Sequence, residues 1–179
     1  MTERRTVLST LLAGAAAAAL PGPLLQAGTR PVSDVAVLNG ALELEHTAIY
    51  AYGLAGGSGL LPRAALDVGG AFKGSHEKHR DALVKVIKGL GGFPISADKT
   101  YAFEAFELKT ETDVLHLALF LEMKAARAYQ AALSSLRHRG LMDAAGRIMG
   151  DEVSHAAALR AVLGKAPVPF WSMLQEGLE

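Results

Sequence analysis

The fold of this chain is decided by the stretch LNGALELEHTAIYAY, residues 38–52, and by its counterpart LHLALFLEMKAARAY, residues 115–129. In both, apolar side chains recur at steps of four, three, four and three residues, which is the spacing of one face of an α-helix. A glutamate interrupts each stripe at the same place, Glu45 in the first and Glu122 in the second. Because an unpaired carboxylate in a core is costly, its repetition predicts that something cationic neutralises both groups.

A second pair of apolar stripes follows these glutamates. Each contains two ligand-type side chains three residues apart, His76 and His79 in the first and Glu152 and His155 in the second. On a helix this spacing points both groups the same way, about one turn apart. The repeat therefore predicts an all-α four-helix bundle made of two helical hairpins, each with one glutamate and one two-ligand turn.

Capping residues, glycines and prolines set the expected helix bounds. The four helices are expected at residues 33–54, 62–90, 110–138 and 141–163. Gly140 is expected to end the third helix. Residues 91–110 show no long period, and a segment of that length suits a crossover along the bundle better than a tight turn. Gly69, Gly70 and Gly74 predict either a close-packing surface or a bend in the second helix.

The two ends of the chain differ from the bundle, which is expected at residues 33–164. Arg4 and Arg5 precede an apolar run within residues 1–27, which resembles a twin-arginine export signal. We therefore expect export by the twin-arginine translocation machinery to the periplasm or another extracytoplasmic site. If the signal stays uncleaved, it is expected to anchor the protein in the membrane. Residues 165–179 are expected to form a tail whose aromatic side chains pack on the bundle.

Composition narrows the function classes. The chain has 18 basic and 18 acidic side chains, and the lysines and arginines are dispersed, which argues against a nucleic-acid partner. It has 0 cysteines, which removes disulfides, thiolate metal sites, cysteine nucleophiles and a lipoprotein anchor. No Gly-x-Ser-x-Gly elbow or phosphate-binding loop is present in the sequence. Any metal must then be held by histidine and carboxylate, a donor set that suits iron, manganese or zinc.

Three short motifs resemble those of the ferritin-like superfamily. Residues 44–52, LEHTAIYAY, and residues 121–129, LEMKAARAY, resemble its L-E-x-x-A-x-x-x-Y helices. Residues 151–155, DEVSH, resemble its E-x-x-H turn. The resemblance covers about residues 33–164, and the chain is similar to exported bacterial ferritin-like domains.

This resemblance implies a metal site with a terminal glutamate from each of the first and third helices. The second and fourth helices would each add a bridging glutamate and a histidine. The matching residues are Glu45 and Glu122 as terminal ligands, Glu152 as a bridge, and His79 and His155 as imidazole ligands. His76 departs from the pattern, because it stands where the first E-x-x-H turn should have its glutamate. With His76 included, six residues are expected to converge on the metal.

The departure at His76 matters for charge. Three carboxylates bring three negative charges, whereas two divalent ions bring four positive ones. A hydroxide or oxide bridge would make up the difference; without it, the second ion should bind weakly or not at all. Glu77 lies about 100° from His76 around the helix and is expected to be solvated. The sequence thus leaves open a single metal, a mixed pair, or a site that has lost its redox chemistry.

Three functions are compatible with these residues. The first is diiron-type redox or ferroxidase chemistry, and the second is non-enzymatic binding of a single metal. The third is a metal-free ferritin-like scaffold that acts through its surface, for example as a homodimer. Tyr52 and Tyr129 are expected to be core residues with one hydroxyl hydrogen bond, and a bond to a metal-bound glutamate would suit them. His46 and His116 are expected to be peripheral.

Overall fold

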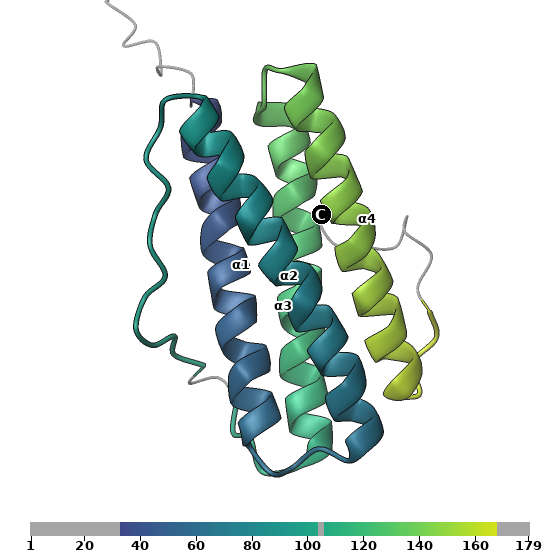
Figure 1. Cartoon of the computed structure of the whole chain (residues 1–179). Coiled ribbons are helices and arrows are strands. Elements are labelled where there is room, and N and C mark those ends of the chain that lie inside the picture. Colours follow the sequence, from purple (N-terminus) through teal and green to yellow (C-terminus); the bar gives the residue numbers. More distant parts are fainter. Residues whose placement is uncertain (1–32, 104–105, 168–179) are drawn as a thin grey trace, which may run out of the picture. The chain divides into compact units, whose positions relative to one another are not determined.

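Four α-helices form the part of the chain that this computed structural model describes, residues 33–103 and 106–167. They are α1 (Asp34–Gly57), α2 (Arg63–Gly89), α3 (Glu111–Ser135) and α4 (Arg139–Val162). α1 and α2 form one antiparallel hairpin, and α3 and α4 form the other (Figure 1). The predicted all-α bundle is confirmed. The export segment expected at residues 1–27, and the tail aromatics Phe170 and Trp171, lie outside the described residues.

The predicted long crossover joins the two hairpins. After α2 the chain runs back along α1 before α3 begins (Figure 1). Two hydrogen bonds from the side-chain amide of Asn39 on α1 hold this segment in place. The amide donates to the carbonyl of Phe93 and accepts from the backbone N–H of Ile95, both at 3.0 Å. Further along, Tyr50 on α1 packs its ring 5.5 Å from that of Tyr101. The crossover thereby brings α1 and α3 side by side, as a ferritin-like arrangement requires.

The turn between α3 and α4 differs from the sequence prediction. α3 ends at Ser135, three residues earlier than expected, and Gly140 lies in the first turn of α4 instead of ending α3. Leu136 is the reason: its backbone is extended, with φ −71° and ψ 145°, and its side chain is buried in the core. Burying this leucine reverses the chain before the glycine is reached, so packing and not glycine ends the helix.

Of the two roles expected for the three glycines of α2, a close-packing surface is contradicted at Gly70 and Gly74, and a bend stays a prediction. α2 is one continuous α-helix from Arg63 to Gly89, and it includes Gly69, Gly70 and Gly74. A Cβ atom at Gly70 or Gly74 would meet nothing within 4 Å, so neither position is a close-packing contact. Gly69 faces the ring of Tyr52 at ordinary contact distance. These small residues leave space beside α2.

Apolar side chains fill the bundle on both sides of a polar middle. The larger cluster includes residues from all four helices: Leu38, Leu42, Leu83, Ile87, Tyr129 and Ile148. One of two smaller clusters consists of Leu119, Ala156 and Leu159, with Phe72 packed against it. On α3, for example, Glu122 falls between Leu119 and Tyr129. The polar middle is therefore closed on both sides by apolar packing.

None of the four helices in the described ranges has an apolar stretch long enough to cross a membrane.

Candidate metal centre

The six residues singled out from the sequence lie together in the polar middle of the bundle. α1 and α3 each contribute one glutamate, while α2 and α4 each contribute a pair three residues apart, as expected. The six are all buried, with exposed fractions of 8% or less: Glu45, His76, His79, Glu122, Glu152 and His155. Acidic and imidazole groups from four helices thus meet at one point, and their binding of a metal stays a prediction.

The six side chains form two overlapping groups of four. One consists of Glu45, His76, His79 and Glu152, and the other of His76, Glu122, Glu152 and His155. Within each group, one ligand atom from every residue lies within 4.8 Å of the others. His76 and Glu152 belong to both groups. The donor atoms are therefore arranged as two adjacent sites with two shared residues.

In the first group the donors of three helices face one another. His76 Nδ1 lies 2.8 Å from Glu45 Oε2, and His79 Nδ1 lies 3.6 Å from Glu45 Oε1. His79 Nδ1 also lies 3.0 Å from Glu152 Oε1. That last pair is close enough for a hydrogen bond but is not aligned for one.

In the second group Glu122 is the central carboxylate. His76 Nε2 lies 3.2 Å from Glu122 Oε1, and His155 Nδ1 lies 3.3 Å from Glu122 Oε2. His155 Nδ1 is also 3.7 Å from Glu152 Oε2. The two oxygens of Glu152 thus face different groups, Oε1 the first and Oε2 the second.

Three donor atoms show that a cation fits this cluster. His79 Nδ1 and both carboxylate oxygens of Glu152 are buried without a hydrogen-bond partner among the described residues. A buried polar atom without a partner costs roughly 1–3 kcal/mol or more. Cations bound in the two groups would satisfy all three. The cluster can therefore hold a metal ion through nitrogen and oxygen donors.

The histidines are strongly basic in this surrounding. Burial alone would lower the pKa of His76, but hydrogen bonds to Glu122 and Glu45 outweigh it and raise the pKa to about 10. The same balance raises the pKa of His79 to about 10 and that of His155 to about 9. Without a metal, protonated rings therefore neutralise the carboxylates.

The three carboxylates respond differently to burial. Burial tends to raise the pKa of Glu45 and of Glu122, but hydrogen bonds from the histidines outweigh it and lower the pKa of both. For Glu152 burial dominates, and its pKa is raised. The adjacent carboxyl group of Glu122 adds to this effect, and His155 and His79 oppose it without cancelling it, so Glu152 is the weakest acid of the three.

Two tyrosines hold the terminal carboxylates in a crossed pattern. Tyr52 on α1 donates its hydroxyl to Glu122 Oε1 on α3, and Tyr129 on α3 donates to Glu45 Oε1 on α1 at 2.5 Å. Burial and the adjacent carboxylate charges raise the pKa of both hydroxyls, so they remain donors. The expected single hydroxyl hydrogen bond is confirmed for each tyrosine, and it links the two halves of the repeat.

Asp151 is a residue of the cluster that the sequence reading missed. Its Oδ2 lies 3.1 Å from His79 Nε2, which leaves His79 Nδ1 pointing into the first group. Carboxylates in this outer position orient histidine ligands in many metal sites. Asp151 immediately precedes Glu152 in the sequence, but this position does not distinguish it from an ordinary surface aspartate. Its side chain is in fact 61% exposed.

The other polar residues considered from the sequence stay outside the cluster. Glu77 lies 3.4 Å from Lys73, with 41% of its side chain exposed, so it does not replace the missing carboxylate. His46 lies 3.4 Å from the carbonyl of Ile95 in the crossover. His116 is exposed on α3.

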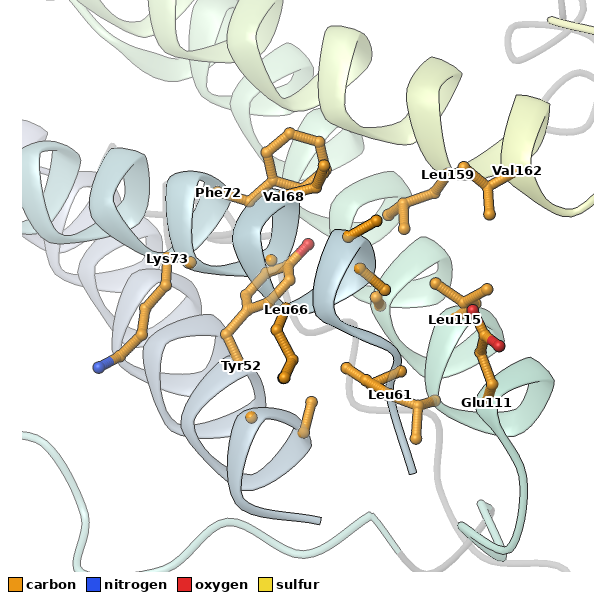
Figure 2. Close-up of a pocket in the computed structure, with 18 of the residues that line it drawn as sticks. Tyr52, Leu61, Leu66, Val68, Phe72, Lys73, Glu111, Leu115, Leu159 and Val162 are labelled. Atoms are coloured by element: carbon orange, nitrogen blue, oxygen red, sulfur yellow. The ribbon is translucent and has the colours of Figure 1, made fainter. Parts of the chain in front are cut away.

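An apolar cavity of about 490 Å³ lies beside Tyr52 and Phe72 (Figure 2). Tyr52 and Phe72 form part of its wall, together with Leu115, Leu159 and small residues of α1 and α2. These two rings also contact the cluster, since Tyr52 bonds Glu122 and the ring of Phe72 stacks 4.1 Å from that of His155. The cavity and the donor atoms are thus separated by two aromatic side chains.

A helical bundle with one long crossover and buried glutamates and histidines from all four helices defines the ferritin-like class. Comparison with known sequences agrees: the ferritin-like domain family matches residues 33–165, and the chain belongs to that family. No curated protein gives a significant match. Among solved structures, the chain is similar to a conserved hypothetical protein from Mycobacterium tuberculosis, with 24% identity and a TM-score of 0.69. The match covers 76% of this chain and 94% of that one, and it shows the fold alone.

Proposed function

We propose that this chain is a metal-binding protein whose glutamate and histidine cluster holds divalent ions, with iron as the first choice and manganese or zinc as alternatives. The observation that carries the proposal is the set of buried donor atoms without a partner in the described chain, His79 Nδ1 and both oxygens of Glu152. Hard oxygen donors combined with imidazole suit these metals. The crossed tyrosines support the proposal, because such outer hydrogen bonds typically hold carboxylate ligands in place.

For chemistry beyond binding, we propose diiron-type oxidation. Bound iron would supply one-electron chemistry with dioxygen or peroxide. The protein's own groups prepare the site: Tyr52 and Tyr129 fix the terminal carboxylates, and Asp151 orients His79. Apolar side chains pack on both sides of the site. Ferrous ion consumption faster than in buffer would support this part of the proposal, and a rate equal to that of buffer would refute it.

A matched pair of variants tests metal binding. Metal-free protein is loaded anaerobically with ferrous, manganous or zinc ion, desalted, and analysed for metal per chain. Wild type should retain metal, and Glu122→Ala should lose most of it while its helical circular dichroism stays unchanged. Glu43→Ala removes a carboxylate from α1 outside the cluster and should retain the wild-type amount. Wild type that takes up none of the three ions contradicts the proposal.

A second candidate is a ferritin-like scaffold that carries no metal. The raised pKa values of His76, His79 and His155 favour it, since three protonated rings would balance three carboxylates without any ion. This candidate predicts that purified protein contains no metal and that chelator leaves its melting temperature unchanged. Metal retained through purification, and lost only with chelator, would rule it out.

We also propose export. The support is the arginine pair Arg4 and Arg5 before an apolar run, which resembles a twin-arginine signal. Replacing both arginines with lysine should retain the protein in the cytoplasm, as followed by cell fractionation. Unchanged export of that variant would refute the twin-arginine route.

A further inference from the structure

His76 lies at the centre of the cluster with its two ring nitrogens on different sides. Nδ1 is 2.8 Å from Glu45 Oε2 in the first group, and Nε2 is 3.2 Å from Glu122 Oε1 in the second. The ring is 1% exposed. No other histidine of the described residues belongs to both groups. Its position thus gives each group one nitrogen of the same ring.

The neighbouring rings set this orientation. Tyr52 lies beside the ring of His76, with centroids 5.6 Å apart and planes inclined by 30°. His79 and His155 present their rings edge-on to His76, at 6.0 and 5.7 Å. The ring of His76 is thus surrounded by three other rings. The packed core therefore fixes which group each nitrogen faces.

The other shared residue, Glu152, has the same relation to the two groups. Its Oε1 lies 3.0 Å from His79 Nδ1 in the first group, and its Oε2 lies 3.7 Å from His155 Nδ1 in the second. His76 on α2 and Glu152 on α4 are the first members of the two ligand pairs of the repeat. The two residues that belong to both groups thus occupy corresponding positions in the two halves of the repeat.

We propose that His76 binds two cations at once, one through each ring nitrogen, in the place where a bridging glutamate would stand. This inference rests on the proposed metal binding. A ring bound through both nitrogens carries no proton and contributes one negative charge. Together with Glu45, Glu122 and Glu152 it supplies four negative charges, which balance two divalent ions without an added oxide or hydroxide. In this form His76 supplies the negative charge that is missing because a histidine stands in place of a glutamate.

The competing arrangement binds a metal through one nitrogen only. The second nitrogen would then keep its hydrogen bond to a carboxylate, as histidine ligands usually do. The distance between the metals separates the two arrangements. Metal–nitrogen bonds of about 2.1 Å on both sides of one ring place the ions about 6 Å apart. Two-metal sites of the usual kind hold their ions about 3.5–4 Å apart.

The test is anomalous diffraction from crystals of the zinc-loaded full chain, with zinc per chain measured on the same protein in solution. The proposal predicts two zinc ions about 6 Å apart with the ring of His76 between them. A single ion, or two ions about 3.5–4 Å apart with one nitrogen of His76 unbound, overturns it while metal binding stands. A chain that takes up no metal at all contradicts the proposed function itself.

Variants at position 76 provide an independent solution readout. His76→Gln should lower the zinc content from two ions per chain to one. His76→Glu should keep two ions, because a carboxylate restores the bridge and the charge. His116→Gln removes an exposed histidine of α3 and should retain two ions. Circular dichroism shows whether His76→Gln folds. If it folds and still binds two ions, the bridge is refuted. If it does not fold, a failure of His76→Glu to bind two ions refutes the bridge.

Discussion

At the scale of single residues, each terminal carboxylate depends on a tyrosine from a different helix. Tyr129 donates to Glu45 and Tyr52 donates to Glu122, so the hydroxyl of one half of the repeat serves the glutamate of the other. A carboxylate held in this way has fewer orientations to lose when it binds an ion. The two tyrosines therefore act as positioning residues for the cluster.

Tyr129→Phe tests that role. The variant removes the hydroxyl and leaves the ring in the core, so the fold should remain. We expect metal affinity to fall by about 10–100-fold, which is typical for loss of an outer hydrogen bond to a ligand. Competition with a fluorescent chelator measures this. Tyr50→Phe alters a tyrosine that packs on the crossover, and it should leave affinity unchanged. Equal affinity of wild type and Tyr129→Phe would contradict the assignment.

The raised histidine pKa values predict how pH affects the metal-free protein. His76 and His79 have pKa values of about 10 in the folded chain and His155 about 9, against 6.5 for the free side chain. The folded state therefore binds more protons than the unfolded state between these values. The stability from these rings is fully present below about pH 6.5 and is lost as pH rises through 9 to 10.

Denaturant unfolding of chelator-treated protein at pH 6 and pH 9 measures this effect, and we expect lower stability at pH 9. Metal-loaded protein provides the control. Its ligands bind the ion without their protons, so its advantage over the metal-free form should grow with pH. A metal-free protein that becomes more stable between pH 7 and pH 9 would contradict the proton-balanced cluster.

At the scale of elements, two glycines after the end of α2 determine how closely the crossover packs against α1. The backbone turns at Gly91 with φ +73°. At the next residue, a Cβ on Gly92 would lie 2.6 Å from Val35 Cγ1 and 2.9 Å from Val35 Cγ2. Real Cβ atoms essentially never come that close to another heavy atom, so any larger residue here would force the crossover away from Val35 on α1.

Gly92→Ala should accordingly destabilise the chain by about 1–3 kcal/mol, the usual cost of overpacking. Gly70→Ala is the matched control, because its Cβ would meet nothing within 4 Å on α2. That variant should gain up to about 1 kcal/mol from helix propensity. Urea unfolding measures both changes. Destabilisation by Gly70→Ala similar to that by Gly92→Ala would show that crowding at Val35 is not the cause.

At the scale of the whole described bundle, the cluster joins helices that otherwise hardly meet. Each hairpin packs along its length and α1 packs on α3, whereas α2 and α4 approach one another at few points. His79 on α2 reaches both Asp151 and Glu152 on α4. An ion in the cluster would thus add a link between α2 and α4, whose backbones approach one another at few points.

Removal of metal should therefore loosen the bundle along α2 and α4. A ligand at 100 times its dissociation constant stabilises a protein by about 2.7 kcal/mol, so chelator should lower the melting temperature by several degrees. Hydrogen exchange should quicken most in α2 and α4. Glu122→Ala, which is expected to bind little metal, should show no chelator effect. Equal exchange rates with and without metal would contradict a role of the ion in joining the helices.

Much of this arrangement was predictable, because the direction of a side chain on a helix is set by the local period. Glu45, Glu122 and the pairs three residues apart could be placed on inward faces from spacing alone. The four helices and the long crossover followed from the same pattern and from the glycines between periodic stretches. Metal binding and export remain predictions.

Periodicity and residue type, which are local properties, were thus enough to predict the bundle and the six side chains that meet inside it. Tertiary structure alone decided which tyrosine bonds which glutamate, that Asp151 reaches His79, and that the nitrogens of His76 face two groups. It also ended α3 at Ser135 and opened the apolar cavity beside Phe72. These features depend on distances between helices, which no single stretch of sequence encodes.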